Sequence, residues 1–287
     1  MLVEENLEFS IDRNTGWDRR IVCLKCGELV RSYLIRTERF VVVYDTLLGP
    51  KSGTLLRNEA RKLADGRPLL VVNSHADWDH YFGNMVFDEP ILGTQAMVER
   101  VTGGVGAKEL ADKRKEHPDS YGLVQLRAPN VALPTEATLH GGDLTLQLLF
   151  TRGHRPDHLA IYIPEIATLL PGDCVEDPIP LVDEDSDESS RTIEELKLSL
   201  KRFLELAPTW VLANHAPPEQ GVTRIESNLK YLEKLQQAAL DSASLEQLKS
   251  SWPADDSWDE FYRKAHRSHL RMARQQMNQA RPKWADD

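Results

Sequence analysis

Short apolar runs separated by turns dominate the first quarter of the chain. Residues 21–24, 30–35 and 39–45 are rich in β-branched and aromatic residues, and this pattern predicts three strands. Over residues 53–63 the apolar positions recur at helical spacing, which predicts a surface helix. Residues 67–72 are almost continuously apolar, as is typical of a strand that is buried on both faces.

The second half repeats this alternation of strands and helices. Residues 144–150, 159–163 and 167–170 form apolar runs that predict strands. A helix with a wide apolar face is predicted over residues 192–206, and a further strand over 209–213. Mixed strands with interspersed helices indicate a layered α/β domain.

Two stretches depart from this pattern. Residues 100–140 are polar and mostly helical or irregular, so they are interpreted as a cap inserted into the domain. Residues 222–280 are rich in Leu, Gln, Ala, Lys and Arg and are broken at Trp252-Pro253, which predicts two or three helices. We therefore expect one domain over residues 1–221 and a helical extension over residues 222–287.

Composition and charge restrict the class of protein. The 287 residues are 41% hydrophobic and 28% charged, as in ordinary globular proteins. A formal net charge of −10 opposes binding to nucleic acid, and the acidic run 182–190 is expected to be a solvated loop that overhangs the site. The chain begins without a signal-peptide pattern and has no apolar run that could span a bilayer, so we expect a cytoplasmic protein.

The three cysteines do not indicate a disulfide framework or a zinc knuckle. Cys23 and Cys26 have the spacing of a zinc-binding pair, but no second Cys/His pair follows at a suitable distance. In a strand they would also face opposite sides. We therefore expect both to be structural, and Cys174 to be a small buried thiol.

Potential metal ligands follow four of the predicted strands. They are His75, His154, Asp173 and His215. Sites are commonly carried on loops that a rigid sheet holds in place. One histidine after a strand would mean little, but four such coincidences indicate a common site.

The first of these ligands opens a dense cluster, His75-Ala-Asp77-Trp-Asp79-His80. Imidazole and carboxylate groups suit zinc, iron and manganese. Carboxylates buried this close together repel one another unless cations neutralise them. The alternative is a simple helix cap, but a cap needs no set of distant partners.

The motifs together resemble those of the metallo-β-lactamase superfamily, in the branch that includes hydroxyacylglutathione hydrolases and lactonases. The pieces that carry the resemblance are FVVVYDT at 40–46, NSHADWDH at 73–80, TRGHRPDH at 151–158, LLPGD at 169–173 and LANH at 212–215. The resemblance implies a four-layer αββα sandwich over residues 1–221, extended by the C-terminal helices, with a metal centre along one edge.

The resemblance also implies two divalent metal ions and a ligand set for them. The first ion would be held by His75, Asp77 and His154, the second by Asp79, His80 and His215, with Asp173 bridging both. In that family a hydroxide held by the metals attacks an ester, thioester or lactone. Asp79 would additionally take up a proton as general base.

Asp77 departs from the commoner family motif, which has histidine at that position. A carboxylate is a harder ligand, so it shifts preference from zinc, the first choice, toward iron or manganese. Alternatively, Asp77 is too short to reach the metal. The flavodiiron branch has a carboxylate here too, as Glu, but it needs a flavin domain, and nothing in this sequence resembles one.

Several other residues are weighed beside the ligands. Arg155 is a candidate for binding an anionic group of the substrate, with a plain surface salt bridge as the alternative. His158 and Asp45 are expected to orient ligands or support the fold. His266 and His269 share a helix face, and without a carboxylate in their motif we expect them to be solvent-exposed.

The function that the sequence favours is a dinuclear metal-dependent hydrolase acting on a small ester, thioester or lactone. The alternatives are an iron-dependent oxidase or dioxygenase of the same fold and a non-catalytic metal-binding scaffold. We expect a small-molecule substrate and neither nucleic acid nor membrane as partner, while a homodimer stays open. The cap and the C-terminal helices are expected to select the substrate.

Overall fold

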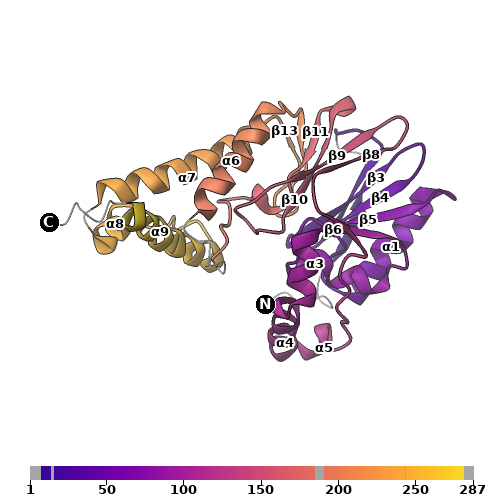
Figure 1. Cartoon of the computed structure of the whole chain (residues 1–287), viewed down its shortest axis with the longest axis horizontal. Helices are drawn as coiled ribbons and strands as arrows, with labels where there is room; N and C mark the ends of the chain where they lie inside the picture. The colour runs from indigo at the N-terminus through magenta and orange to yellow at the C-terminus, as the bar shows by residue number, and fades with distance from the viewer. Residues whose placement is uncertain (1–7, 14–15, 185–190, 243, 281–287) are drawn as a thin grey trace.

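The computed structural model describes residues 8–13, 16–184, 191–242 and 244–280, in which the strands form two sheets (Figure 1). The strands of the first sheet follow sequence order: β1 Phe9–Asp12, β2 Ile21–Cys26, β3 Val30–Arg36, β4 Val41–Tyr44, β5 Leu69–Val72, β6 Ile91–Thr94 and β7 Val131–Leu133. The second sheet runs from β13 to β8: β13 Glu219–Gln220, β12 Trp210–Val211, β11 Thr168–Leu170, β10 Leu159–Ile163, β9 Thr145–Phe150 and β8 Ala137–His140.

Helices cover the outer faces of both sheets and extend beyond them (Figure 1). Their bounds are α1 Pro50–Ala64, α2 Trp78–Tyr81, α3 Gln95–Thr102, α4 Val105–Glu116, α5 Pro118–Tyr121, α6 Thr192–Glu205, α7 Thr223–Asp241, α8 Leu245–Ser251 and α9 Glu260–Ala280. None of the helices in the described ranges is long and apolar enough to cross a membrane.

The strand pattern explains why the layers stack as they do. Successive side chains of a strand point to opposite faces, and β4 shows the consequence. Val42 and Tyr44 enter the core between the two sheets, whereas Val41 and Val43 pack against the buried face of α1. All four are fully buried. The predicted four-layer αββα sandwich is therefore confirmed.

The same alternation of side chains places Cys23 and Cys26 on opposite faces of their strand. Cys23 lies in the core between the sheets, and Cys26 lies in the core beneath α1. The two side chains thus face opposite sides of β2, as the sequence predicts. Burial raises the pKa of the Cys23 thiol to about 12, so it stays protonated and unreactive.

Residues 100–140, expected to form a cap, contain two strands of the sheets as well as helices. Helices α4 and α5 occupy the first half of this segment, but β7 pairs with β6 and β8 pairs with β9. These two strands lie at the ends of the sheets, and many of their side chains are exposed. Because they bury little apolar surface, their sequence lacks the pattern that would have identified them as strands.

The C-terminal residues form three helices, α7, α8 and α9, in agreement with the sequence (Figure 1). Helix α7 packs against α6, and α8 and α9 pack against α7; one apolar core joins them to the outer face of the second sheet. Leu169 of β11, Leu232 of α7 and Leu270 of α9 all belong to that core. The division of the chain at residue 221 stays a prediction.

His266 and His269 are fully buried, so the expectation that they are exposed was wrong. The Tyr231 hydroxyl of α7 lies 2.9 Å from Nδ1 of His266 and 3.0 Å from Nδ1 of His269. The backbone carbonyl of Trp252 accepts a hydrogen bond from Nε2 of His266, and Nε2 of His269 accepts one from the backbone N–H of Val182. Partners distant in sequence meet every ring nitrogen, and local spacing cannot reveal them.

Replacing Tyr231 by Phe should destabilise the protein more than an ordinary lost hydroxyl. The change removes the shared partner of two buried imidazole nitrogens, which we expect to lower the free energy of unfolding by about 1–3 kcal/mol. Tyr162→Phe is the matched control, since it removes a single bond to the carbonyl of Leu206 from a half-buried side chain. Urea unfolding of both variants measures the difference. Equal losses would contradict the shared-partner role.

Candidate metal centre

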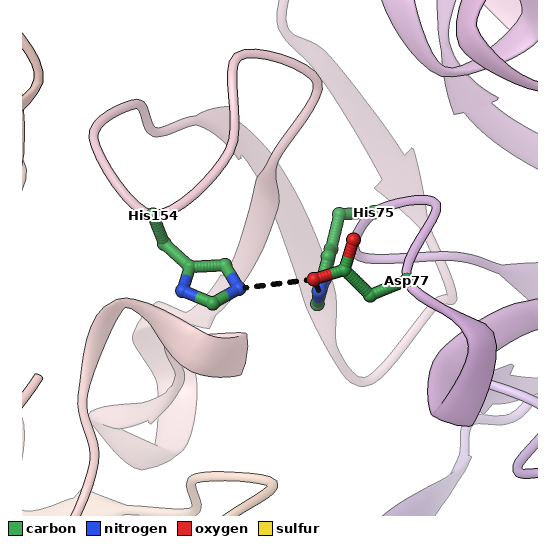
Figure 2. Close-up of side chains that lie close together, drawn as sticks. All are labelled: His75, Asp77 and His154. Carbon is green, nitrogen blue, oxygen red and sulfur yellow. Dashed lines mark ion pairs between the residues drawn. The ribbon is translucent and has the colours of Figure 1, made fainter. Parts of the chain in front are cut away.

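All seven ligands that the sequence proposed converge at one end of the sandwich. The strands β5, β9, β11 and β12 lead into the loops that carry His75, His154, Asp173 and His215. The donor atoms form three overlapping groups: His75, Asp77 and His154; His75, His80 and Asp173; and Asp79, His80 and His215. Figure 2 shows the Asp77 carboxylate pointing toward His154, which comes from a separate loop, with His75 beside Asp77.

Local backbone structure aims these side chains. Asp77 has extended backbone and directly precedes α2, which carries Asp79 and His80 in its single turn. The Asp77 side chain makes no capping hydrogen bond, so the helix-cap alternative does not apply. At Gly172 a positive φ of 59° turns the chain, and a Cβ there would lie 2.3 Å from a ring nitrogen of His158. Only glycine fits this turn, which presents Asp173.

The four histidines share one orientation. Each has its Nδ1 against an oxygen atom: His75 against Ser74 Oγ at 2.9 Å, His80 against Asp45 Oδ2 at 2.9 Å, His154 against the Leu181 carbonyl at 3.3 Å and His215 against the Leu29 carbonyl at 2.6 Å. Carbonyl and carboxylate oxygens only accept, and the Ser74 hydroxyl already donates its proton to Asp45, so Nδ1 carries the proton in all four histidines. In the neutral imidazole, Nε2 is then a bare lone pair.

These Nε2 atoms gather in one buried space. The Nε2 atoms of His75 and His154 are buried and have no hydrogen-bond partner among the described residues. Those of His80 and His215 face each other at 3.2 Å. Two lone pairs that close repel each other, so the arrangement needs protons or metal cations between the nitrogens. The donor set therefore fits metal ions.

The distances between donor atoms suit coordination. Two ligand atoms that each lie about 2.0–2.1 Å from a tetrahedral zinc ion are separated by roughly 3.3–3.4 Å. Asp77 Oδ2 lies 3.5 Å from Nε2 of His75 and 3.7 Å from Nε2 of His154. On the other side, Asp79 Oδ2 lies 3.3 Å from Nε2 of His215. Two ligand groups of similar size thus lie side by side.

Asp173 lies between the two groups. Its Oδ2 is 3.6 Å from Nε2 of both His75 and His154, 3.0 Å from that of His80 and 3.3 Å from that of His215. This single oxygen therefore lies near all four imidazoles. Its Oδ1 is buried without a hydrogen-bond partner.

The pKa values of the buried groups show that the site requires positive charge. Burial would lower the pKa of His80 and of His215, but Asp173 and Asp79 outweigh it and hold both values well above the ordinary range. Burial would likewise raise the pKa of Asp173, yet His215 and His80 keep it well below its ordinary value. Without metal, protons therefore supply the positive charge that the buried carboxylates demand.

Two buried residues next to the candidate ligands, Asp45 and His158, fix the orientation of the ligands through hydrogen bonds. Both carboxylate oxygens of Asp45 accept hydrogen bonds from Ser74, and Oδ2 also accepts from Asn214 and from Nδ1 of His80. His158 accepts a hydrogen bond from the backbone N–H of Asp173. Neither Asp45 nor His158 belongs to the ligand groups. They hold the ligands in place, as the sequence suggested.

Arg155 is turned toward the ligands and the acidic segment. Its Nε lies 2.9 Å from Asp77 Oδ2, and its Nη1 lies 2.8 Å from Oδ1 of Asp183, which is buried. The solvated-loop expectation for residues 182–190 is therefore wrong at Asp183, because an arginine neutralises its charge. Residues 185–190 lie outside the described part of the chain. Whether Arg155 also binds substrate stays a prediction.

The sequence did not point to Arg100, Glu176 or Tyr262. Arg100 of α3 lies 3.1 Å from Asp77 Oδ1. The buried carboxylate of Glu176 lies 3.8 Å from Nδ1 of His154 and accepts a hydrogen bond from Tyr262 of α9. Glu176 follows Asp173 by three residues, but only the fold shows where its side chain points.

A cavity of about 910 Å³ opens over the metal centre. Its lining includes Asp77, Asp79 and Asp173. One wall comes from α4 and α5, with Lys113 and Tyr121, and α9 contributes further lining residues. Helices α4, α5 and α9 therefore all border the cavity that holds the candidate ligands.

Residues 27–215 match the sequence model of the metallo-beta-lactamase superfamily. The chain belongs to this superfamily. Membership agrees with the sandwich fold and with the His/Asp groups, and it identifies the protein as a metal-dependent hydrolase.

Individual relatives are distant. The chain is 28% identical over 168 residues to the human acyl-coenzyme A thioesterase MBLAC2, a match that covers 53% of this chain and 60% of that protein. The chain thus spans less than two thirds of this curated relative.

Solved structures agree on the fold. A metallo-beta-lactamase family protein from Thermus thermophilus has a TM-score of 0.62 at 20% identity, covering 86% of this chain and 89% of that one. A beta-lactamase domain protein from Burkholderia ambifaria has a TM-score of 0.66 at 19% identity, covering 96% and 93%. At such identities the likeness concerns the fold alone.

Removing the metal should change how stability depends on pH. In metal-free protein, the raised pKa values of His80 and His215 add stability that is complete below the unfolded value of about 6.5. This stability is lost as pH rises through the raised values. Metal-loaded protein keeps its cations and should not show this loss. Thermal unfolding with excess zinc and with a chelator, at increasing pH from about 6.5, measures both trends.

Exposed His140 offers a control, since His140→Gln should leave both trends unchanged. Parallel curves for metal-free and metal-loaded protein would contradict the competition between protons and metal.

Proposed function

We propose that this protein is a dinuclear metal-dependent hydrolase of acyl thioesters and related small esters. The observation that carries the proposal is the position of Asp173, whose Oδ2 lies within 3.6 Å of Nε2 atoms belonging to both ligand groups. In the proposed assignment His75, Asp77 and His154 hold one ion, Asp79, His80 and His215 hold the other, and Asp173 is shared. Bound divalent ions would polarise the acyl carbonyl and lower the pKa of the attacking water.

Asp79 is the proposed general base. Its carboxylate lines the cavity and lies beside Nε2 of His215 and of His80, at 3.3 and 3.7 Å. Burial would raise the pKa of Asp79, but His80 and His215 outweigh it and keep the carboxylate ionised at neutral pH. An ionised carboxylate in the lining of the cavity can accept a proton during the attack.

The cavity supports an acyl substrate. Trp78, Tyr121, Phe261 and Tyr262 place aromatic rings along its walls, and such surfaces favour an apolar acyl group. A thiolate is a good leaving group because thiols ionise near pH 8.5, so a thioester needs less protonation of the leaving atom than an alkyl ester does. The thioesterase activity named for the human relative supports the same substrate class.

The charge of the cavity bears on the carrier to which the acyl group is attached. Carboxylates such as Glu116 and Glu184 line it together with the amines of Lys113 and Lys264. The acidic groups exceed the basic ones in this lining, and the whole chain has a net charge of −10. A carrier without phosphates should therefore bind at least as well as one that has them.

Turnover of acyl thioesters by zinc-loaded protein tests the proposal. We expect hydrolysis of acyl-N-acetylcysteamine with a KM no higher than that for the same acyl group on coenzyme A. Asp79→Asn should lower kcat by about 10²- to 10⁴-fold, because the proton acceptor is lost. Thiol release, followed spectroscopically, measures both effects.

Asp88→Asn is the matched control, because Asp88 is an exposed carboxylate that pairs with Arg57 outside the cavity lining. It should leave kcat unchanged. Protein with two bound ions that hydrolyses neither thioesters nor esters would overturn the proposal. Oxygen consumption by iron-loaded protein would support the oxidative alternative instead.

A further inference from the structure

The unusual ligand Asp77 is held between two arginines from separate segments. Its Oδ1 lies 3.1 Å from Nη2 of Arg100 on α3, and its Oδ2 lies 2.9 Å from Nε of Arg155 in the loop after β9. The three side chains are mostly buried, with 13%, 14% and 20% exposure for Asp77, Arg100 and Arg155. Ion pairs this sheltered are stronger than those on an open surface.

The two contacts set the direction of the carboxylate. One guanidinium binds each oxygen, so rotation of the carboxylate would break both ion pairs. In this orientation Oδ2 also faces Nε2 of His75 at 3.5 Å and Nε2 of His154 at 3.7 Å. Because the aspartate side chain is short, its orientation decides whether it can reach a metal. The two ion pairs hold Asp77 so that Oδ2 faces the same space as the two imidazoles.

The surrounding charges also cancel. Along the line Arg100, Asp77, Arg155 and Asp183, positive and negative groups alternate. The extra negative charge that Asp77 brings, relative to a neutral histidine, is therefore balanced by the protein itself. Glu109 of α4 also lines the cavity near these groups, but burial and the neighbouring Asp77 raise its pKa to about 8, so it adds little negative charge at neutral pH.

We propose that Arg100 and Arg155 are positioning residues that form a guanidinium clamp on Asp77, so that a carboxylate takes the place of a histidine at the first metal. The inference rests on the proposed function for the presence of two metals. It assigns Arg155 a role through Asp77, since its Nε and Nη1 already bind two carboxylates.

Zinc binding to the full chain tests the clamp without an activity assay. Zinc per chain and its affinity are measured by elemental analysis and by competition with a chromophoric chelator. Wild-type protein should bind two ions. Arg155→Met should weaken one of them about 10- to 100-fold, as typically follows the loss of a group that orients a ligand. Arg155→Lys, which keeps the charge, should retain part of the affinity.

A double-mutant cycle separates the clamp from a general structural role. Asp77→Ala should weaken the same ion, and adding Arg155→Met to it should change the affinity by less than about 2-fold, because Arg155 contacts the ligand group through Asp77. A full additional loss in the Asp77→Ala background would overturn the inference. So would Arg155→Met protein that keeps both ions at wild-type affinity.

Controls keep the outcomes distinct. Arg152→Met, in the same loop but exposed and paired with Glu195, should bind zinc like wild type. If Arg155→Met fails to fold, as judged by circular dichroism, Arg100→Met carries the same test, with weakening of one ion expected and wild-type affinity contradicting the clamp. A wild-type chain that binds no zinc would overturn the proposed function itself, and the clamp with it.

Discussion

The structure is organised around a set of buried groups that cannot satisfy one another. Four imidazole Nε2 atoms and the carboxylates of Asp77, Asp79 and Asp173 share one space at the edge of the sandwich. The Nδ1 atom of each of the four imidazoles donates a hydrogen bond to an oxygen acceptor. The lone pairs and negative charges that face inward are stable only beside protons or metal cations. This requirement connects the fold to metal-dependent hydrolysis.

The sandwich meets that requirement because rigid strands end where the ligands begin. Each central strand contributes side chains to two cores, one between the sheets and one under a helix layer. Such strands move little, so the loops that follow them present donor atoms at reproducible distances. Asp45, buried at the end of β4, joins the loop of Ser74 to that of Asn214 and orients His80.

Three consecutive residues, 181–183, connect helix α9 to the site. The Leu181 carbonyl accepts from His154, the backbone N–H of Val182 donates to His269 of α9, and Asp183 pairs with Arg155. The helices therefore do more than border the cavity. Their buried histidine and tyrosine network anchors the segment that orients one candidate ligand and the arginine beside Asp77.

The sequence by itself determined the layered fold and the candidate ligands that the structure brings together. Apolar periodicity located the central strands because their side chains are buried on both faces, and His75, His154, Asp173 and His215 follow those strands directly. Their chemistry could be inferred because several metal-binding side chains rarely follow strand ends without a shared purpose.

Only the tertiary structure decided where the remaining polar groups belong. His266 and His269 are buried because Tyr231 and Val182 supply hydrogen-bond partners from far along the chain. Arg100 reaches Asp77 from a helix that carries no signature of the site. Sequence patterns report where apolar surface is buried. A buried polar residue depends on partners that only folding brings together, and local spacing does not encode them.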